Sequence, residues 1–149
     1  MKRLFYLSAI LIAICSCGNS KTKEEEVVVK EVTVWKANLN DTTGMLYMEK
    51  ATTSEIDSLS ASSVIGYMNS LYGNIKLDYV KTGNDTLYLK IPDARYLTQQ
   101  MGSTGPEMYF AELVYNLTEA TSKKYVNVDF EEGDHAQPGT YSREDFKEK

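Results

Sequence analysis

The sequence predicts an α/β (α+β) fold, a single small domain in which two helices pack on an antiparallel or mixed sheet. The chain has 149 residues, of which 42% are hydrophobic and 25% charged, and this fits one domain with one core. Several short segments alternate apolar and polar residues, a period of two that indicates half-buried strands. Two longer segments repeat apolar residues at every third or fourth position, as amphipathic helices do. In chain order these segments read β-β-α-β-β-α-β.

The first two predicted strands form a hairpin. Residues 32–37 alternate and are rich in the β-branched and aromatic side chains that strands favour. Residues 38–44 are a turn cluster, and residues 45–50 predict the returning strand.

A helix is predicted next, over about residues 55–72. Ser54 and Asp57 have the spacing of a capping box, although the serine-rich first half also allows a start near Ser60. Gly73 is a natural C-terminal stop.

A second hairpin is the clearest predicted element. Ile75, Leu77 and Tyr79 alternate with polar or exposed positions, and residues 87–91 alternate in the same way. The turn residues 82–85 separate the two strands. Because side chains alternate across a strand, we expect each apolar set to lie on one face.

The second helix is predicted after a connector over residues 94–103. Thr104 and Glu107 have capping-box spacing, and Pro106 suits a first helical turn. The apolar stripe of this helix is Phe110, Leu113, Val114 and Leu117.

A last strand is predicted over residues 125–130, and the chain then ends in a polar tail that starts at Asp134. Phe146 is the one large apolar residue near the terminus.

The first sixteen residues have the layout of a secretory signal peptide. Two basic residues are followed by an apolar run over residues 4–14, which is too short to span a membrane. The run ends in Ile14-Cys15-Ser16-Cys17, which resembles the lipobox of bacterial lipoproteins. We therefore expect residues 1–16 to be removed and a lipid to be attached to Cys17.

Other roles for the two cysteines fit less well. A disulfide between Cys15 and Cys17 would be strained, and a zinc site would need further ligands although the chain has a single histidine, His135. A cleaved signal peptide without lipid is the remaining alternative. The lipid on this class of cysteine has two or three acyl chains, which anchor a protein stably where one chain holds only marginally. This predicts a protein of the bacterial cell envelope, on the outer membrane facing the periplasm or on the cell surface.

Residues 17–30 are predicted to be an acidic flexible tether, because they are polar and charged before residue 27. The glutamates at 24–26 are either a solvated linker or a signal for export to the cell surface. Removing residues 1–16 takes away two of the 16 basic residues and none of the 21 acidic ones, which gives a net charge of −7. A surface this acidic argues against nucleic acid as a partner.

Residues 31–149 resemble a GerMN domain, the module of bacterial sporulation and germination lipoproteins. The similarity is firm in residues 87–133, which follow the family's order of strand, loop, helix and strand. The family's "TLTE" motif at the end of the helix is matched by Asn116-Leu117-Thr118-Glu119, and the end of its last strand by Glu132-Gly133. Asn116 departs from the motif, and the family's usual proline and arginine near Met45–Thr52 are missing. The resemblance implies a compact domain similar to ring-building motifs, with an assembly or interaction role and no catalytic residues.

The resemblance implies a protein-binding surface, and the sequence offers candidate residues for it. Tyrosine is common at interfaces, and Thr118 and Glu119 close the helix. The candidate interaction surface is Tyr88, Tyr109, Tyr115, Thr118 and Glu119. The tyrosines are equally suited to the rim of a small core, and the Thr118-Glu119 pair to plain polar surface.

Motifs for catalysis or for a cofactor are not recognisable in the sequence. His135, near Asp129, Glu131 and Asp134, allows a calcium site or a catalytic base, but neither spacing matches a known motif. We therefore expect a lipid-anchored, non-enzymatic envelope protein that binds a protein partner or assembles with itself, without metal or cofactor. The alternative is an envelope lipoprotein that binds a small ligand or a glycan in an aromatic-lined pocket.

Overall fold

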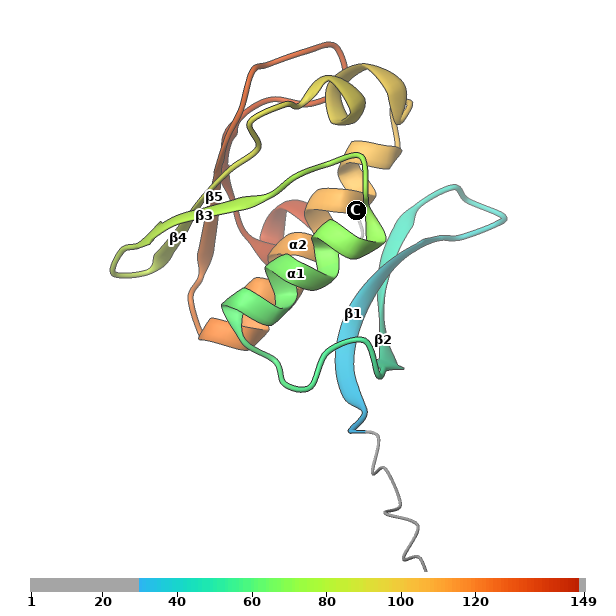
Figure 1. The fold of residues 1–149 in the computed structure, drawn as a ribbon. Helices are drawn as coiled ribbons and strands as arrows, with labels where there is room; N and C mark the ends of the chain where they lie inside the picture. The colour runs from blue at the N-terminus through green and yellow to red at the C-terminus, as the bar shows by residue number, and fades with distance from the viewer. Residues whose placement is uncertain (1–29, 148–149) are drawn as a thin grey trace, which may run out of the picture.

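Six strands form two separate sheets in the computed structural model, which describes residues 30–147 (Figure 1). The first sheet is the antiparallel hairpin of β1 (Val32–Leu39) and β2 (Leu46–Thr53). The second sheet has four strands in the order β3 (Asp78–Thr82), β4 (Thr86–Lys90), β5 (Tyr125–Asp129) and β6 (Gly139–Tyr141). It is mixed, since β4 and β5 are parallel and the other pairs antiparallel. The predicted α+β class and strand–helix order are confirmed, while the division into two sheets and the strand β6 were not predicted.

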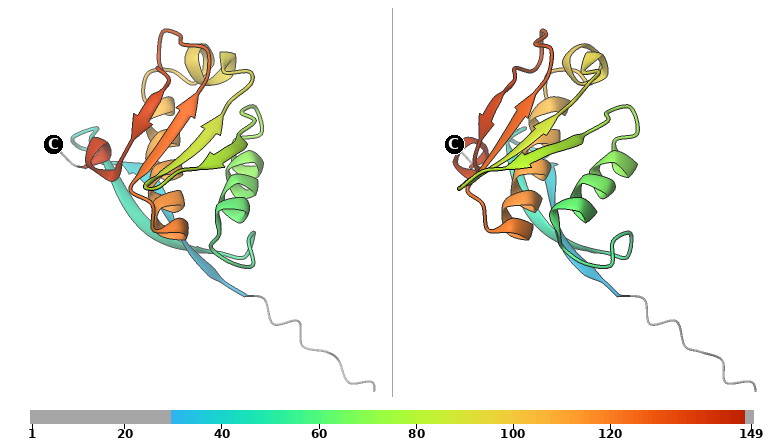
Figure 2. Two further views of the ribbon diagram at one scale, coloured as in Figure 1. Left: turned by 90° about the vertical axis from the view of Figure 1, so that its left-hand side faces the viewer. Right: turned by 60° about the vertical axis from the view of Figure 1, so that its left-hand side comes forward.

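Two helices cover one face of the four-stranded sheet and leave the other face open (Figure 2). They are α1 (Ala61–Leu71) and α2 (Gly105–Thr121). The helix α2 connects the parallel strands β4 and β5, which a tight turn cannot join. Between β4 and α2 lies one π-helical turn, η1 (Tyr96–Gln100), and a 3₁₀ turn, η2 (Arg143–Phe146), follows β6.

The core lies between the helices and the covered face of the sheet. The predicted stripe of α2 is confirmed, because Phe110, Leu113, Val114 and Leu117 are each at most 4% exposed. The inward residues of the two central strands oppose this stripe: Leu87, Leu89, Val126 and Val128. The period-two and 3.6-residue patterns therefore identified the core correctly in these elements.

The predicted capping boxes of both helices are wrong. Ser60 caps α1 by accepting a hydrogen bond from the Ser63 N–H at 3.2 Å, so the later of the two predicted starts is the correct one. Ile56, which the longer helix would have included, packs into the core from the loop before α1. At α2, Thr104 itself has a helical backbone and makes no side-chain cap, although Pro106 does lie in the first turn as predicted.

The second hairpin differs from its prediction at β3. Ile75 and Leu77 are buried, but they precede the strand, and Tyr79 is 52% exposed. The register shifts between Tyr79 and Lys81, which is a β-bulge. The Asn69 side chain explains the late start of the strand, because its amide accepts from the Leu77 N–H at 2.7 Å and donates to the Leu77 C=O at 3.0 Å.

The segment predicted as a polar tail is folded. Tyr141 of β6 stacks on Phe110 with ring centroids 4.7 Å apart, and Phe146 packs against the core. Before β6, the chain passes so close to η1 that a Cβ on Gly133 would lie 2.6 Å from the Thr98 Cβ. A glycine is therefore required where the sequence predicted the end of the last strand.

Candidate interaction surface: the β1–β2 arm and its joint

The β1–β2 hairpin, called the arm here, is held edge-on against α2 by side chains rather than by a neighbouring strand. The Asn116 amide accepts from the Trp35 N–H and donates to the Trp35 C=O, both at 2.8 Å. Its NH₂ group also donates to the Glu112 C=O at 2.9 Å. Asn116 therefore makes with β1 the pair of hydrogen bonds that another strand would make, and it is only 1% exposed.

One helical turn earlier, Glu112 extends this attachment. Its carboxylate accepts from the Ala37 N–H at 3.0 Å and from the Tyr72 O–H at 2.8 Å. Burial raises the pKa of Glu112, and these two hydrogen bonds oppose that rise. The pKa of Tyr72 is also raised, first by burial and then by the Glu112 charge. The buried carboxylate of Glu112 thus accepts hydrogen bonds from one strand amide, that of Ala37, and from the phenol of Tyr72.

A second group of contacts, called the joint here, connects the arm, α2 and the C-terminal turn. Its centre is Arg143, whose Nε donates to Thr118 Oγ1 at 2.7 Å. One terminal nitrogen of Arg143 donates to the Tyr115 C=O at 2.8 Å and to Glu119 Oε2 at 2.7 Å. The Arg143 hydrogen bond lowers the pKa of Glu119, so this carboxyl stays ionised. The joint consists of Trp35, Lys50, Tyr115, Thr118, Glu119 and Arg143.

Stacking in the joint surrounds Trp35, the only tryptophan of the chain. The Lys50 ammonium lies 4.9 Å from the Trp35 ring centroid, and the Arg143 guanidinium lies 5.6 Å from it. Tyr115 meets the Trp35 ring edge-on at 5.2 Å. Lys50 also lies 3.6 Å from Glu119, so strands and helix are joined by cation–π and ionic contacts together.

The outer edge of β2 is unpaired within residues 30–147. The backbone groups of Trp35 and Ala37 point to α2, so the residues opposite them, Lys50 and Met48, turn their own backbone groups away from β1. At the tip of the arm, Leu39 is 39% and Met45 41% exposed. The arm therefore combines a closed edge at β1 with an open edge at β2 and two exposed apolar residues beside its polar turn.

The predicted interaction residues do not form one surface, and Tyr109 is wrongly assigned. It is 0% exposed, lies edge-on to Tyr72 at 5.0 Å, and belongs to the core. The prediction failed because Tyr109 lies on the buried face of α2, which is wider than the predicted apolar stripe.

Three of the other predicted residues meet in the joint. Tyr115 is half-buried, Thr118 is 9% exposed and Glu119 is exposed. Thr118 is therefore not available to a partner protein, because its hydroxyl donates to the Val114 C=O at 2.7 Å and accepts from Arg143.

Tyr88 lies apart from the joint, on the open face of the four-stranded sheet. It alternates with the buried Leu87 and Leu89, and the Lys81 ammonium lies 4.8 Å from its ring centroid. Cys17, the predicted lipid attachment site, lies outside the described residues.

A surface hollow of about 490 Å³ lies beside the joint. Arg143, Lys123 and Lys124 line it, together with Glu119 and Glu144, and Tyr125 is its one aromatic residue. The hollow is open to solvent, and Lys123 already donates to the Asn84 C=O at 2.6 Å. An aromatic-lined pocket of the kind that a glycan-binding protein would need is not formed by these residues.

The residues considered for a cation or for catalysis are not assembled. His135 is exposed, and its backbone N–H donates to the Thr98 C=O at 3.1 Å. Over residues 30–147, no three Asp, Glu, His or Cys side chains are grouped so that they could hold a metal ion. None of the helices in that part of the chain is long and apolar enough to cross a membrane.

No family model, curated protein or solved structure matches the chain. The similarity to GerMN domains therefore stays a prediction from the residues. In the structure, the three polar residues of Asn116-Leu117-Thr118-Glu119 each make a contact: Asn116 binds β1, and Thr118 and Glu119 bind Arg143.

Proposed function

We propose that this chain is a lipid-anchored, non-enzymatic protein of the bacterial cell envelope whose GerMN-like domain binds a protein partner or assembles with itself. The observation that carries the proposal is the arm, which presents an unpaired strand edge and, beside its polar turn, the exposed Leu39 and Met45, while its other edge is bound to α2. Edge strands are templates for pairing with another chain unless they are short, bulged or covered. β2 is eight residues long and its register with β1 is continuous.

The attachment of the arm in one defined position supports a binding role. Binding costs conformational entropy, and a surface that is already ordered loses less of it. Asn116 and Glu112 hold the β1 backbone at Trp35 and at Ala37, and Arg143 stacks on the Trp35 ring. The edge of β2 would thus be offered to a partner in one defined position.

The anchor at Cys17 would set where this surface works. Residues 17–29 span about 40 Å when fully extended, so the domain would search for its partner close to the membrane. Cys17→Ala should release the protein into the soluble fraction and abolish fatty-acid labelling, while Cys15→Ala should change neither. Release by Cys15→Ala alone would show that the lipobox is assigned wrongly.

The interaction is tested by photo-crosslinking in cells. A photoreactive residue replaces Met45 at the tip or Glu49 in β2, and in the control it replaces Lys90 on the open sheet face. We expect defined adducts, either with one envelope protein or with a second copy, from the two arm positions and not from Lys90. An arm that gives no adduct, or the same adducts as Lys90, would contradict the proposal.

A further inference from the structure

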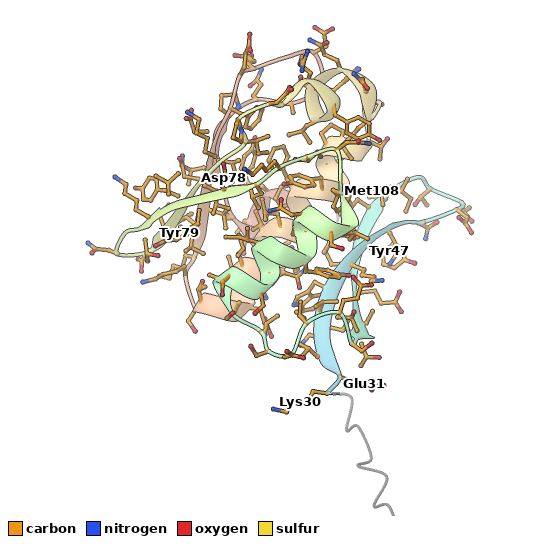
Figure 3. All side chains as sticks on the ribbon, viewed as in Figure 1. Lys30, Glu31, Tyr47, Asp78, Tyr79 and Met108 are labelled. Atoms are coloured by element: carbon orange, nitrogen blue, oxygen red, sulfur yellow. The ribbon has the colours of Figure 1, made fainter. Side chains whose placement is uncertain are left out.

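The two long edge strands of the described residues differ in how they are protected. β3 has a bulge between Tyr79 and Lys81, and the Lys81 side chain lies over Tyr88. A bulge and a lysine are common devices against edge pairing. β2 pairs with β1 over all eight residues without a bulge. Figure 3, in which Tyr47 and Tyr79 are labelled, places these two edges on opposite sides of the molecule.

The backbone of β2 is oriented for pairing. Because Met48 and Lys50 turn their N–H and C=O groups away from β1, every even-numbered residue of the strand does so. None of these outward groups of Leu46, Met48, Lys50 and Thr52 has a hydrogen-bond partner within residues 30–147. The strand begins with Leu46, Tyr47 and Met48, which carry no charge, and Glu49 and Lys50 follow.

We infer that two copies of this chain join through the first half of β2, antiparallel across a twofold axis centred on Tyr47. The inference rests on the proposed function and names self-assembly as its form. The arrangement unites two two-stranded arms into one four-stranded sheet. Its contact is isologous, since each copy offers the same residues to the other.

The side chains restrict the register to the start of the strand. A twofold axis perpendicular to the sheet sets even-numbered residues opposite even-numbered ones and odd opposite odd. One residue of the strand therefore lies opposite its own copy, and the axis is centred on that residue. Centring on Glu49 or on Lys50 sets two like charges directly opposite, which is destabilising. Centring on Met48 sets Leu46 opposite Lys50, which already lies over Trp35.

Centring on Tyr47 sets apolar residues opposite each other. Tyr47 faces its copy, and Leu46 faces Met48 of the other chain twice. At each end of the contact this register sets the exposed Met45 opposite Glu49 of the other copy, where Glu49 also accepts a hydrogen bond from the Asn38 amide. Aromatic and aliphatic cross-strand pairs of this kind stabilise antiparallel sheets.

The contact is short, which predicts a weak dimer in solution. Specific stable interfaces bury roughly 1,200–2,000 Å², and a ladder of about four residues per chain reaches less than this. Attachment of both copies to one membrane would raise their effective concentration. The dimer is therefore expected mainly on the membrane.

A cysteine at position 47 tests the register. In an antiparallel sheet the pair centred on Tyr47 is of the non-hydrogen-bonded type, with Cα atoms about 4.5 Å apart. This separation is within the range that a disulfide spans. The anchored chain with Tyr47→Cys should give a disulfide-linked dimer in an oxidising periplasm, at least fivefold more than the parent chain.

Two control positions keep the test specific. Thr52→Cys lies on the same strand but about 30 Å from its copy in this register, and Val80→Cys is 53% exposed in the wild type on the β3 edge. Both should stay monomeric. Equal dimer from all three variants, or none from Tyr47→Cys, would overturn the inference. Adducts of the arm with a different protein, together with monomeric Tyr47→Cys, would overturn it and leave the proposed function standing.

A backbone variant tests the ladder itself. Met48→Pro removes an N–H that points to solvent, which an edge strand tolerates, whereas Met48→Leu keeps both the N–H and an apolar side chain. Combined with Tyr47→Cys, Met48→Leu should keep the dimer and Met48→Pro should reduce it at least fivefold, with thermal unfolding midpoints within a few degrees. Equal dimer yields from these two variants would show that no backbone ladder forms.

Discussion

The two hairpins of this protein are both antiparallel strand pairs, and they lie in different surroundings. β3 and β4 continue into a four-stranded sheet, where β5 pairs with β4 along its whole length. β1 and β2 form a sheet of their own, and α2 occupies the edge of β1 where a third strand would lie. The same device appears in both places, because Asn69 binds the Leu77 backbone as Asn116 binds that of Trp35.

The two hairpins differ in how far their attachment depends on an asparagine side chain that binds the strand backbone. At β3 the asparagine only positions the residue that precedes the strand, and the sheet supplies the other hydrogen bonds. In the arm, Asn116 and Glu112 supply the hydrogen bonds of the β1 edge at Trp35 and Ala37. Besides the buried Val34 and Ala37, only a few polar side chains therefore hold the arm on the body. The arm should open locally at a lower free energy than the sheet does.

Asn116→Leu is expected to have the largest effect. It leaves the N–H and C=O of Trp35 without partners next to a buried helix, which costs about 2–4 kcal/mol of unfolding free energy. Denaturant titration measures the loss, and amide hydrogen exchange should show that residues 32–53 become the fastest-exchanging part of the domain.

Asn69→Leu is the matched control. It should also destabilise the protein, yet it should accelerate exchange near Leu77 and leave the arm unchanged. If both variants accelerated exchange uniformly, the arm and the sheet would be one cooperative unit and the contrast between them would fail.

Arg143→Ala should have the next largest effect. It removes hydrogen bonds to Thr118, Glu119 and the Tyr115 carbonyl together with stacking on Trp35, at a cost of about 1–3 kcal/mol. Because Trp35 is the only tryptophan, its fluorescence reports the joint directly. Arg143→Lys keeps the charge but not the three hydrogen bonds, so it should fall between the wild type and Arg143→Ala. An unchanged emission spectrum in Arg143→Ala would show that the joint does not order Trp35.

Glu112→Gln should change the pH dependence of stability more than stability itself. Burial raises the folded-state pKa of Glu112 above its usual value, so the folded protein binds more protons than the unfolded chain between the two values. Its contribution is therefore fully present below the unfolded-state pKa and is lost as the pH rises through the folded-state pKa. Glutamine can still accept from the Ala37 N–H and carries no charge. Relative to wild type, the urea midpoint of Glu112→Gln should rise between pH 4.5 and 7.5, and a constant difference would refute this.

The sequence predicted the elements whose surroundings are periodic. A stripe such as Phe110, Leu113 and Leu117 repeats with the helix, and Leu87 and Leu89 repeat with the strand, so burial on one face leaves a visible pattern. This was sufficient for the order of the elements as far as β5 and for most of the core, but not for the start of β3 or for β6.

The joint and the arm's attachment could not be predicted in this way. Asn116 and Glu112 are polar residues in a helix that is buried on nearly all sides, and their partners are backbone groups 81 and 75 residues away. Periodicity does not encode contacts at that separation. One signal was available, since two polar residues four positions apart in a buried stripe require hydrogen-bond partners. Arg143 gave no such signal, because it lay in a segment predicted to be a polar tail.

Ser122→Gly is expected to have the smallest effect and to act on the body alone. Ser122 ends α2 with a left-handed backbone, φ 56° and ψ 21°, a conformation that glycine adopts without the penalty of a Cβ. Glycine also gains freedom in the unfolded chain, so the net gain should be about 0.5 kcal/mol. Ser122→Ala keeps the Cβ and should give no gain. Thermal unfolding measures the difference, and exchange in residues 32–53 should not change, because the end of α2 at Ser122 lies beyond Asn116 and Glu112, the residues that hold β1. Slower exchange in the arm of Ser122→Gly would mean that the helix end and the arm are coupled, and the arm could no longer be treated as a separately attached unit.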